Sequence, residues 1–140
     1  MKIHHIFFLL LAIGGCNTKD KIIEKQQENL LMAAITNGQW VVTSFHKGAS
    51  DVTADFTGYK FQFKNNYTVD AIKNGNVEKT GTWAAAGNAQ AQTMTSNFAN
   101  STQPLILLNG TWNIITTTWT SVEASMMVNS EIYTIRLDKQ

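Results

Sequence analysis

The stretch "GYKFQFKNNYTVDAIKNGNVEKTGTW", residues 58–83, decides the fold class of this chain. Aromatic and polar side chains alternate over residues 59–64, which is the period-two pattern of a half-buried strand. The pair "NN" turns the chain into "YTVDAIK". The pair "NG" at residues 74 and 75 turns it again, because Asn-Gly favours the left-handed backbone of a two-residue hairpin. We therefore predict three consecutive antiparallel strands here.

Strand-like segments continue on both sides of this meander. "QWVVTSFH" precedes it, and "PLILL", "TWNIITTTW", "SVEASMMV" and "IYTIRLDK" follow it, separated by turn residues. "PLILL" begins with Pro104, a position that a strand tolerates. Whether residues 92–98 form a strand or a loop is left open by their small, polar composition.

No helical segment lies between these strands to make parallel crossovers. We predict an all-β domain of about eight antiparallel strands, arranged as an up-and-down barrel or a strongly curled sheet. Closure of the sheet would remove the exposed edges through which such strands aggregate.

The first fifteen residues, "MKIHHIFFLLLAIGG", have the layout of an export signal. One lysine precedes an apolar run, and two glycines follow it. The run is far shorter than the roughly 20 residues of a membrane-spanning helix. We expect residues 1–15 to be a cleaved signal peptide.

Cys16, the only cysteine, follows this signal directly. The segment Ile13-Gly14-Gly15-Cys16 resembles the lipobox of bacterial lipoproteins, in which the cysteine thiol receives a diacylglyceryl group and the freed amine is acylated. The alternative is an ordinary buried cysteine. The resemblance implies a palmitate-type membrane anchor at Cys16 and a place in the cell envelope of a Gram-negative bacterium. No acidic residue directly follows the cysteine, and by the sorting rules of the lipoproteins that it resembles this implies the outer membrane.

Residues 16–37 differ from the β-region in composition and in the spacing of their apolar residues. They are rich in Lys, Glu and Gln and contain no Pro, and apolar residues reach helical spacing mainly in their second half. We predict a lipidated tether that ends in a short helix over residues 28–35. The barrel domain then spans residues 38–140, within the usual size of one domain.

The pattern Gly-x-Trp opens the first strand at Trp40 and recurs at Trp83 and Trp112. A first strand that begins in this way after a helical lead-in is similar to the lipocalin signature, in which the tryptophan closes one end of an eight-stranded barrel. The order of segments behind a lipobox resembles the small lipocalin-like domains of bacterial lipoproteins. For most of these domains the resemblance implies no established ligand.

The aromatic side chains of the predicted barrel allow two interpretations. They could line a cavity for a small hydrophobic ligand, or they could fill a solid core, since a small barrel can be packed entirely by its own side chains. In the second case the protein would be a structural lipoprotein that contacts an envelope protein or glycan. The residues concerned are Trp40, Tyr59, Phe61, Phe63, Trp83 and Trp112.

Trp119 differs from these residues. A regular strand over "TWNIITTTW" places Trp119 on the face opposite Trp112, unless a bulge intervenes. We therefore single out Trp119 as an exposed residue that could contact a sugar or a protein.

Charge and chemistry narrow the function further. The chain has 11 Lys and Arg and 10 Asp and Glu residues, and loss of Lys2 with the signal leaves a formally neutral protein. Nucleic-acid binding is not expected, because it requires a concentrated basic face. Enzymatic activity is not expected either. The alternative is a hydrolase built on His46, the only histidine left after cleavage, and it lacks a recognisable nucleophile motif.

No cofactor or metal is expected from the sequence. The acidic residues Asp51, Asp55 and Asp70 lack the ligand density of a calcium loop. Asp51 is equally well explained as a side chain that bonds the backbone of a turn.

Overall fold

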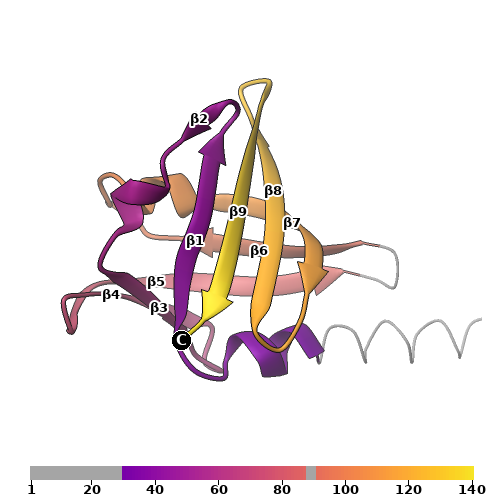
Figure 1. Cartoon of the computed structure of the whole chain (residues 1–140). Coiled ribbons are helices and arrows are strands. Elements are labelled where there is room, and N and C mark those ends of the chain that lie inside the picture. The colour runs from indigo at the N-terminus through magenta and orange to yellow at the C-terminus, as the bar shows by residue number, and fades with distance from the viewer. Residues whose placement is uncertain (1–29, 88–90) are drawn as a thin grey trace, which may run out of the picture.

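The computed structural model describes residues 30–87 and 91–140. The predicted signal peptide, Cys16 and most of the tether lie outside the described residues. Within them the chain forms one antiparallel sheet in the order β2-β1-β3-β4-β5-β6-β7-β8-β9, and a pairing of β1 with β9 closes it into a barrel (Figure 1). The predicted all-β fold is thereby confirmed, and it is consistent with a lipocalin-like fold.

Eight strands of the described chain build the barrel wall, and a two-residue strand, β2, extends one hairpin. The bounds are β1 (Trp40–Lys47), β2 (Ser50–Asp51), β3 (Tyr59–Phe63), β4 (Thr68–Lys73), β5 (Asn76–Gly87), β6 (Gln92–Asn97), β7 (Gly110–Thr117), β8 (Ser121–Val128) and β9 (Glu131–Lys139). Two short 3₁₀ helices, η1 (Thr53–Phe56) and η2 (Leu105–Leu108), lie between strands. A helix over residues 30–35 precedes β1.

The meander β3-β4-β5 has the predicted turns. Lys73 pairs with Asn76, so Asn74 and Gly75 form a two-residue loop. Their φ angles are 51° and 80°, the left-handed backbone that a type I′ turn requires at both positions. Residues 92–97, left open by the sequence, pair with both neighbours as strand β6.

The prediction of a strand for "PLILL" is wrong. The segment forms η2, with Leu105, Leu107 and Leu108 buried and Ile106 exposed. Leu107 N–H donates to the Pro104 carbonyl at 3.0 Å, which closes a tight turn instead of a ladder. A short apolar run is ambiguous because periodicity alone does not separate a buried strand from a helical turn.

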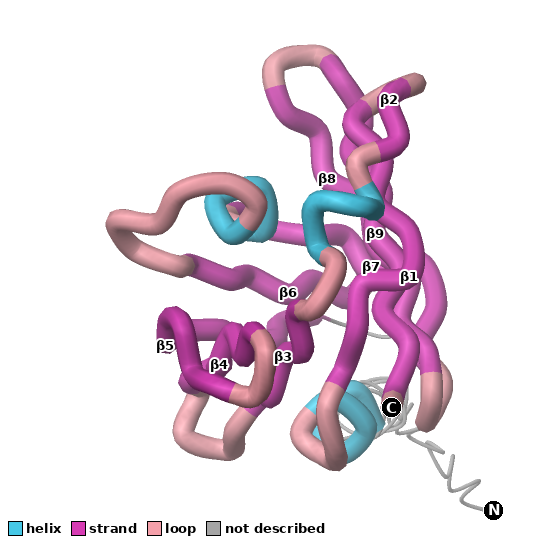
Figure 2. Tube along the Cα trace, turned by 60° about the vertical axis from the view of Figure 1, so that its left-hand side comes forward, coloured by secondary structure: helices cyan, strands magenta, loops and turns pink. Residues whose placement is uncertain are grey.

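The helix over residues 30–35 lies against one end of the barrel, well away from both 3₁₀ helices (Figure 2). Leu31, Ala34 and Ile35 are buried on the side that faces the strands. Trp40 Nε1 donates to the Ile35 carbonyl at 2.9 Å, which ties the helix end to the first strand. In the part of the chain that the structure describes, no helix has the length and apolar character needed to span a bilayer.

Candidate functional site

The barrel interior is almost filled by its own side chains. Inside the described barrel, a cavity of about 30 Å³ lies beside Phe61, Phe63 and Trp112. A single water needs at least about 10–15 Å³ of such space, whereas small-molecule sites measure about 300–1,000 Å³. This cavity therefore has room for little more than a water molecule.

The six aromatic residues singled out in the sequence are all buried, but they do not form one pocket. Phe61, Phe63 and Trp112 line the small cavity, and the other three do not. Trp40 lies at the helix end, where the Lys139 ammonium is 5.0 Å from its ring centroid. Burial, followed by its hydrogen bond to Glu78, raises the pKa of Tyr59 to about 12.

The three Gly-x-Trp copies share one geometry. Each tryptophan is buried, and each indole N–H donates to a backbone carbonyl: Trp40 to Ile35, Trp83 to Lys64 at 3.1 Å and Trp112 to Leu108 at 2.9 Å. A buried indole without a partner would be destabilising. These rings therefore act as hydrogen-bonded plugs in the barrel.

Trp119 lies outside this set. Strand β7 ends at Thr117, so Trp119 occupies the turn before β8 instead of the strand that the sequence suggested. The register also shifts between Ile114 and Thr116, which is the bulge that the sequence left as an alternative. The side chain of Trp119 is 53% exposed. Its surface remains accessible to a partner.

A second exposed aromatic residue, Tyr67, was missed by the sequence analysis. It ends the β3–β4 turn, is 54% exposed and has a φ of 63°. Its ring borders an open groove of about 340 Å³ on the outside of β4, β5 and β6. The available signal was a bulky residue at the last position of a turn, where glycine or asparagine is the usual choice.

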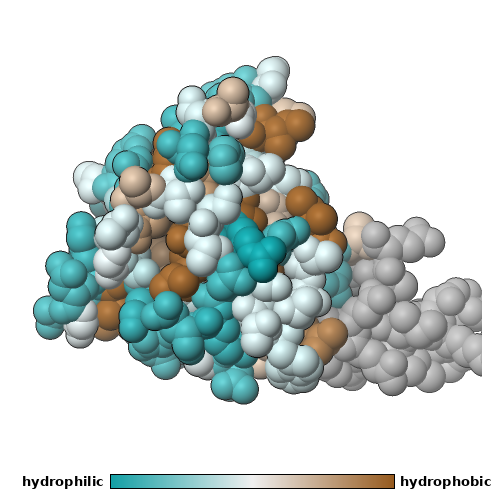
Figure 3. Space-filling model, in the orientation of Figure 1, coloured by the Kyte–Doolittle hydropathy of each residue, from teal (hydrophilic) through white to brown (hydrophobic). Residues whose placement is uncertain are grey.

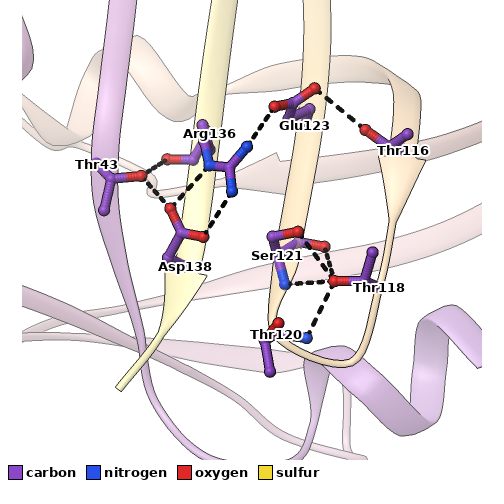
Figure 4. Close-up of polar contacts among 8 residues, drawn as sticks. All are labelled: Thr43, Thr116, Thr118, Thr120, Ser121, Glu123, Arg136 and Asp138. Carbon is purple, nitrogen blue, oxygen red and sulfur yellow. Dashed lines mark hydrogen bonds and ion pairs between the residues drawn. The ribbon is translucent and has the colours of Figure 1, made fainter.

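A network of polar side chains crosses the outer face of β1, β9, β8 and β7 (Figure 4). Arg136 donates to Glu123 Oε1 at 2.6 Å and, through Nε and Nη2, to both carboxylate oxygens of Asp138. Thr43 donates to Asp138, and Thr116 donates to Glu123. The Arg136 guanidinium lowers the pKa of Asp138, while the two carboxylates raise the pKa of Arg136. With its groups paired in this way, the network joins four strands.

The turn beside this network is closed by hydroxyl groups (Figure 4). Thr118 Oγ1 accepts hydrogen bonds from the backbone N–H groups of Thr120 at 3.2 Å and Ser121 at 2.9 Å. These bonds satisfy two backbone N–H groups of the turn in which Trp119 lies.

His46 has two polar neighbours. Its Nδ1 lies 3.2 Å from Ser44 Oγ, but its Nε2 lies 3.9 Å from Asp51 Oδ2, beyond hydrogen-bond distance. The other oxygen of Asp51 accepts from Thr53 N–H and Oγ1, and these bonds lower the pKa of Asp51. Asp51 therefore holds the turn instead of orienting the imidazole.

The three acidic residues considered for a metal occupy different elements. Asp51 lies in β2, Asp55 in η1 and Asp70 in β4, where Lys64 Nζ is 2.6 Å from its carboxylate. Over residues 30–87 and 91–140, no three His, Cys, Asp or Glu side chains are grouped so that they could hold a metal ion.

The face shown in Figure 3 carries small separate apolar areas instead of one continuous patch. Two exposed apolar residues, Met127 and Ile132, lie directly opposite each other across the β8–β9 hairpin. Scattered apolar residues of this kind are usual on soluble surfaces and indicate no docking site by themselves.

Comparison of the chain with models of protein families, with curated proteins and with solved structures finds no match.

Proposed function

We propose that this chain is an envelope lipoprotein of a Gram-negative bacterium, anchored to the outer membrane by acyl chains on Cys16. Its lipocalin-like barrel is a solid scaffold that recognises another component of the envelope through its outer surface. The single observation that carries this proposal is the size of the internal cavity, about 30 Å³. With so little internal space, recognition falls to the outside of the barrel.

Other features agree with a scaffold. The buried tryptophans are held by hydrogen bonds to the backbone, and the barrel wall is tied across four strands by the Arg136 network. Several acyl chains at Cys16 would give a stable anchor, because each buried methylene contributes about 0.8 kcal/mol and one chain alone binds only marginally.

The test joins an anchor measurement to a ligand measurement on the full chain expressed in a Gram-negative host. An alkyne analogue of palmitate should label the protein, and the variant Cys16→Ser should lose the label and leave the outer-membrane fraction. Native mass spectrometry of the delipidated protein should find no bound small molecule. A labelled Cys16→Ser variant, or a stoichiometric hydrophobic ligand, would contradict the proposal.

Binding of a small hydrophobic ligand inside the barrel is the second candidate. The observation in its favour is the apolar lining of the cavity, to which Phe61, Phe63 and Trp112 contribute. Such a ligand would have to displace side chains from a closely packed core. Incubation of the protein with fatty acids and a tetrapyrrole should then quench tryptophan fluorescence saturably, and a lack of quenching would reject this candidate.

A further inference from the structure

The groove beside Tyr67 has an unusual aromatic border. Lys64 N–H donates to the Thr68 carbonyl at 2.9 Å, and Tyr67 N–H donates to the Lys64 carbonyl at 3.0 Å, so residues 65–67 form a tight three-residue loop. Such loops end in a left-handed residue, most often glycine. Here that residue is Tyr67, with a φ of 63°, a conformation that bulky side chains rarely adopt.

Burial does not explain this conformation, because the Tyr67 side chain is 54% exposed. Its ring is instead held from below by Trp83, with centroids 5.8 Å apart and planes at 49°. Trp83 is itself fixed by its hydrogen bond to Lys64 and by the ring of Phe63, which packs perpendicular to it with centroids 5.6 Å apart. Strained residues of this kind persist mainly where function requires them. The half-exposed Tyr67 ring is thus presented to solvent on a packed aromatic support.

The floor of the groove carries a row of neutral polar groups. Thr68 pairs with Thr82 across β4 and β5, and Thr82 pairs with Asn97 across β5 and β6, so the three side chains stand about 4.8 Å apart in one line. Asn66 Oδ1 already accepts two hydrogen bonds from Thr68. Among the described residues, the Thr82 hydroxyl, the Asn97 amide and the Asn66 amide nitrogen have no hydrogen-bond partner.

None of the side chains that line the groove is charged. From Thr80 to Val122 the sequence contains no Asp, Glu, Lys, Arg or His. Lys64 and Asp70, which are close to the groove residues in the sequence, neutralise each other in an ion pair of 2.6 Å, and Lys64 lowers the pKa of Asp70. An anionic polymer would find no cation here to replace its counterions.

We propose that this groove binds a pyranose ring of a neutral glycan. The apolar C–H face of the sugar packs on Tyr67, and the sugar hydroxyl or acetamido groups bond to Thr82, Asn97 and Asn66. The groove volume, about 340 Å³, lies at the lower end of the range of about 300–1,000 Å³ that small-molecule sites occupy. This inference rests on the proposed function in that recognition takes place on the outside of the barrel.

The test uses the purified full chain, labelled with ¹⁵N, in detergent micelles. Triacetylchitotriose, cellotriose and maltotriose are titrated separately, with an acetylated and amidated tri-alanine peptide as the alternative occupant. At least one saccharide should shift the backbone amides of Thr82 and Asn97 and the Asn97 side-chain amide saturably. The variant Tyr67→Asn, which keeps a residue that tolerates a left-handed backbone, should bind about tenfold more weakly or worse.

Trp119→Ala is the matched control, because Trp119 is exposed to nearly the same extent, 53%, but lies in the β7–β8 turn. This variant should bind the saccharide as the parent does. Asn97→Ala, in an exposed strand position that should fold normally, supplies a second loss of binding.

Three results would overturn the glycan site: no shift with any of the three saccharides, equal binding by Tyr67→Asn, or groove shifts with the peptide alone. Each would leave the proposed function standing, since that depends on acylation of Cys16 and on an interior that holds no ligand. Conversely, failure of the Cys16 labelling would not alter the saccharide titration.

Discussion

The ring of Tyr67 lies over the ring of Trp83 with a centroid separation of 5.8 Å, yet the two residues differ in solvent exposure and in backbone conformation. Trp83 is 2% exposed and its indole N–H is bonded inside the protein, whereas Tyr67 is 54% exposed and sits on a left-handed backbone. One ring belongs to the core, and the other uses that core as its support. Trp83 therefore stabilises the fold, whereas Tyr67 is available for contact with another molecule.

Replacing Tyr67 by Asn should leave the free energy of unfolding within about 1 kcal/mol of the parent value. Relief of the left-handed strain, about 1–2 kcal/mol, offsets the lost aromatic pair, about 0.5–1.5 kcal/mol. Urea denaturation followed by tryptophan fluorescence measures this. Tyr67→Val, β-branched and intolerant of positive φ, should instead be clearly destabilised; equal stability of the two variants would show that the backbone is not strained.

Gly81→Ala should destabilise the barrel by about 1–3 kcal/mol, because it overpacks a site that cannot yield. A Cβ at this position would lie 2.6 Å from the Asn97 carbonyl oxygen and 2.8 Å from the Phe98 ring. Gly75→Asn is the control, since a Cβ added there would meet no atom within 4 Å beyond its chain neighbours, and asparagine tolerates its φ of 80°. Thermal unfolding of both variants should show a lowered midpoint for Gly81→Ala alone.

Trp40→Phe should cost about 2 kcal/mol of stability, since it removes the hydrogen bond to Ile35 and part of a fully buried ring. The loss should be felt first in the helix over residues 30–35, whose amides should exchange with deuterium faster. The same substitution at Trp119, which is 53% exposed, should change neither measurement. Unchanged exchange in Trp40→Phe would mean that the helix is held by other contacts.

Acid should destabilise the fold through Asp70. Hydrogen bonding to Lys64 lowers the pKa of this carboxyl below its ordinary value of 3.8. Because the folded-state pKa is the lower one, the stabilisation is fully present above pH 3.8 and is lost as the pH falls through the folded-state pKa. Asp70→Asn should therefore be less stable at neutral pH and should show a flatter decline in acid.

Lys64→Met provides the complementary measurement for the same ion pair, because it removes the main cause of the shift. The carboxyl of Asp70, titrated by NMR, should then have a higher pKa than in the parent protein. An unchanged titration would contradict the assignment of the shift to Lys64.

Local chemistry made much of the fold predictable. The alternation of Tyr59, Phe61 and Phe63 and the Asn74-Gly75 turn act within a few residues, so the meander follows from the sequence directly. The apolar segment after Pro104 was misassigned for the opposite reason. Its helical turn depends on contacts with the barrel end, such as the bond from Trp112 to Leu108, and not on its own periodicity.

The candidate glycan site was not predictable from the sequence. Thr68, Thr82 and Asn97 are unremarkable polar residues until strand register places them in one line, and a slip of one residue would turn each to the other face. Tyr67 likewise becomes a candidate contact residue only because its ring packs on Trp83, which is distant along the chain but adjacent in space.

The sequence by itself determined an all-β chain of consecutive antiparallel strands with an aromatic interior, because alternation and turn chemistry are local properties. Only the tertiary structure decided that the interior is nearly full, that Trp119 lies in a turn and that an uncharged groove opens beside Tyr67. Cavity volume and surface juxtaposition depend on how distant strands close around one another, and no single segment of the chain encodes that closure.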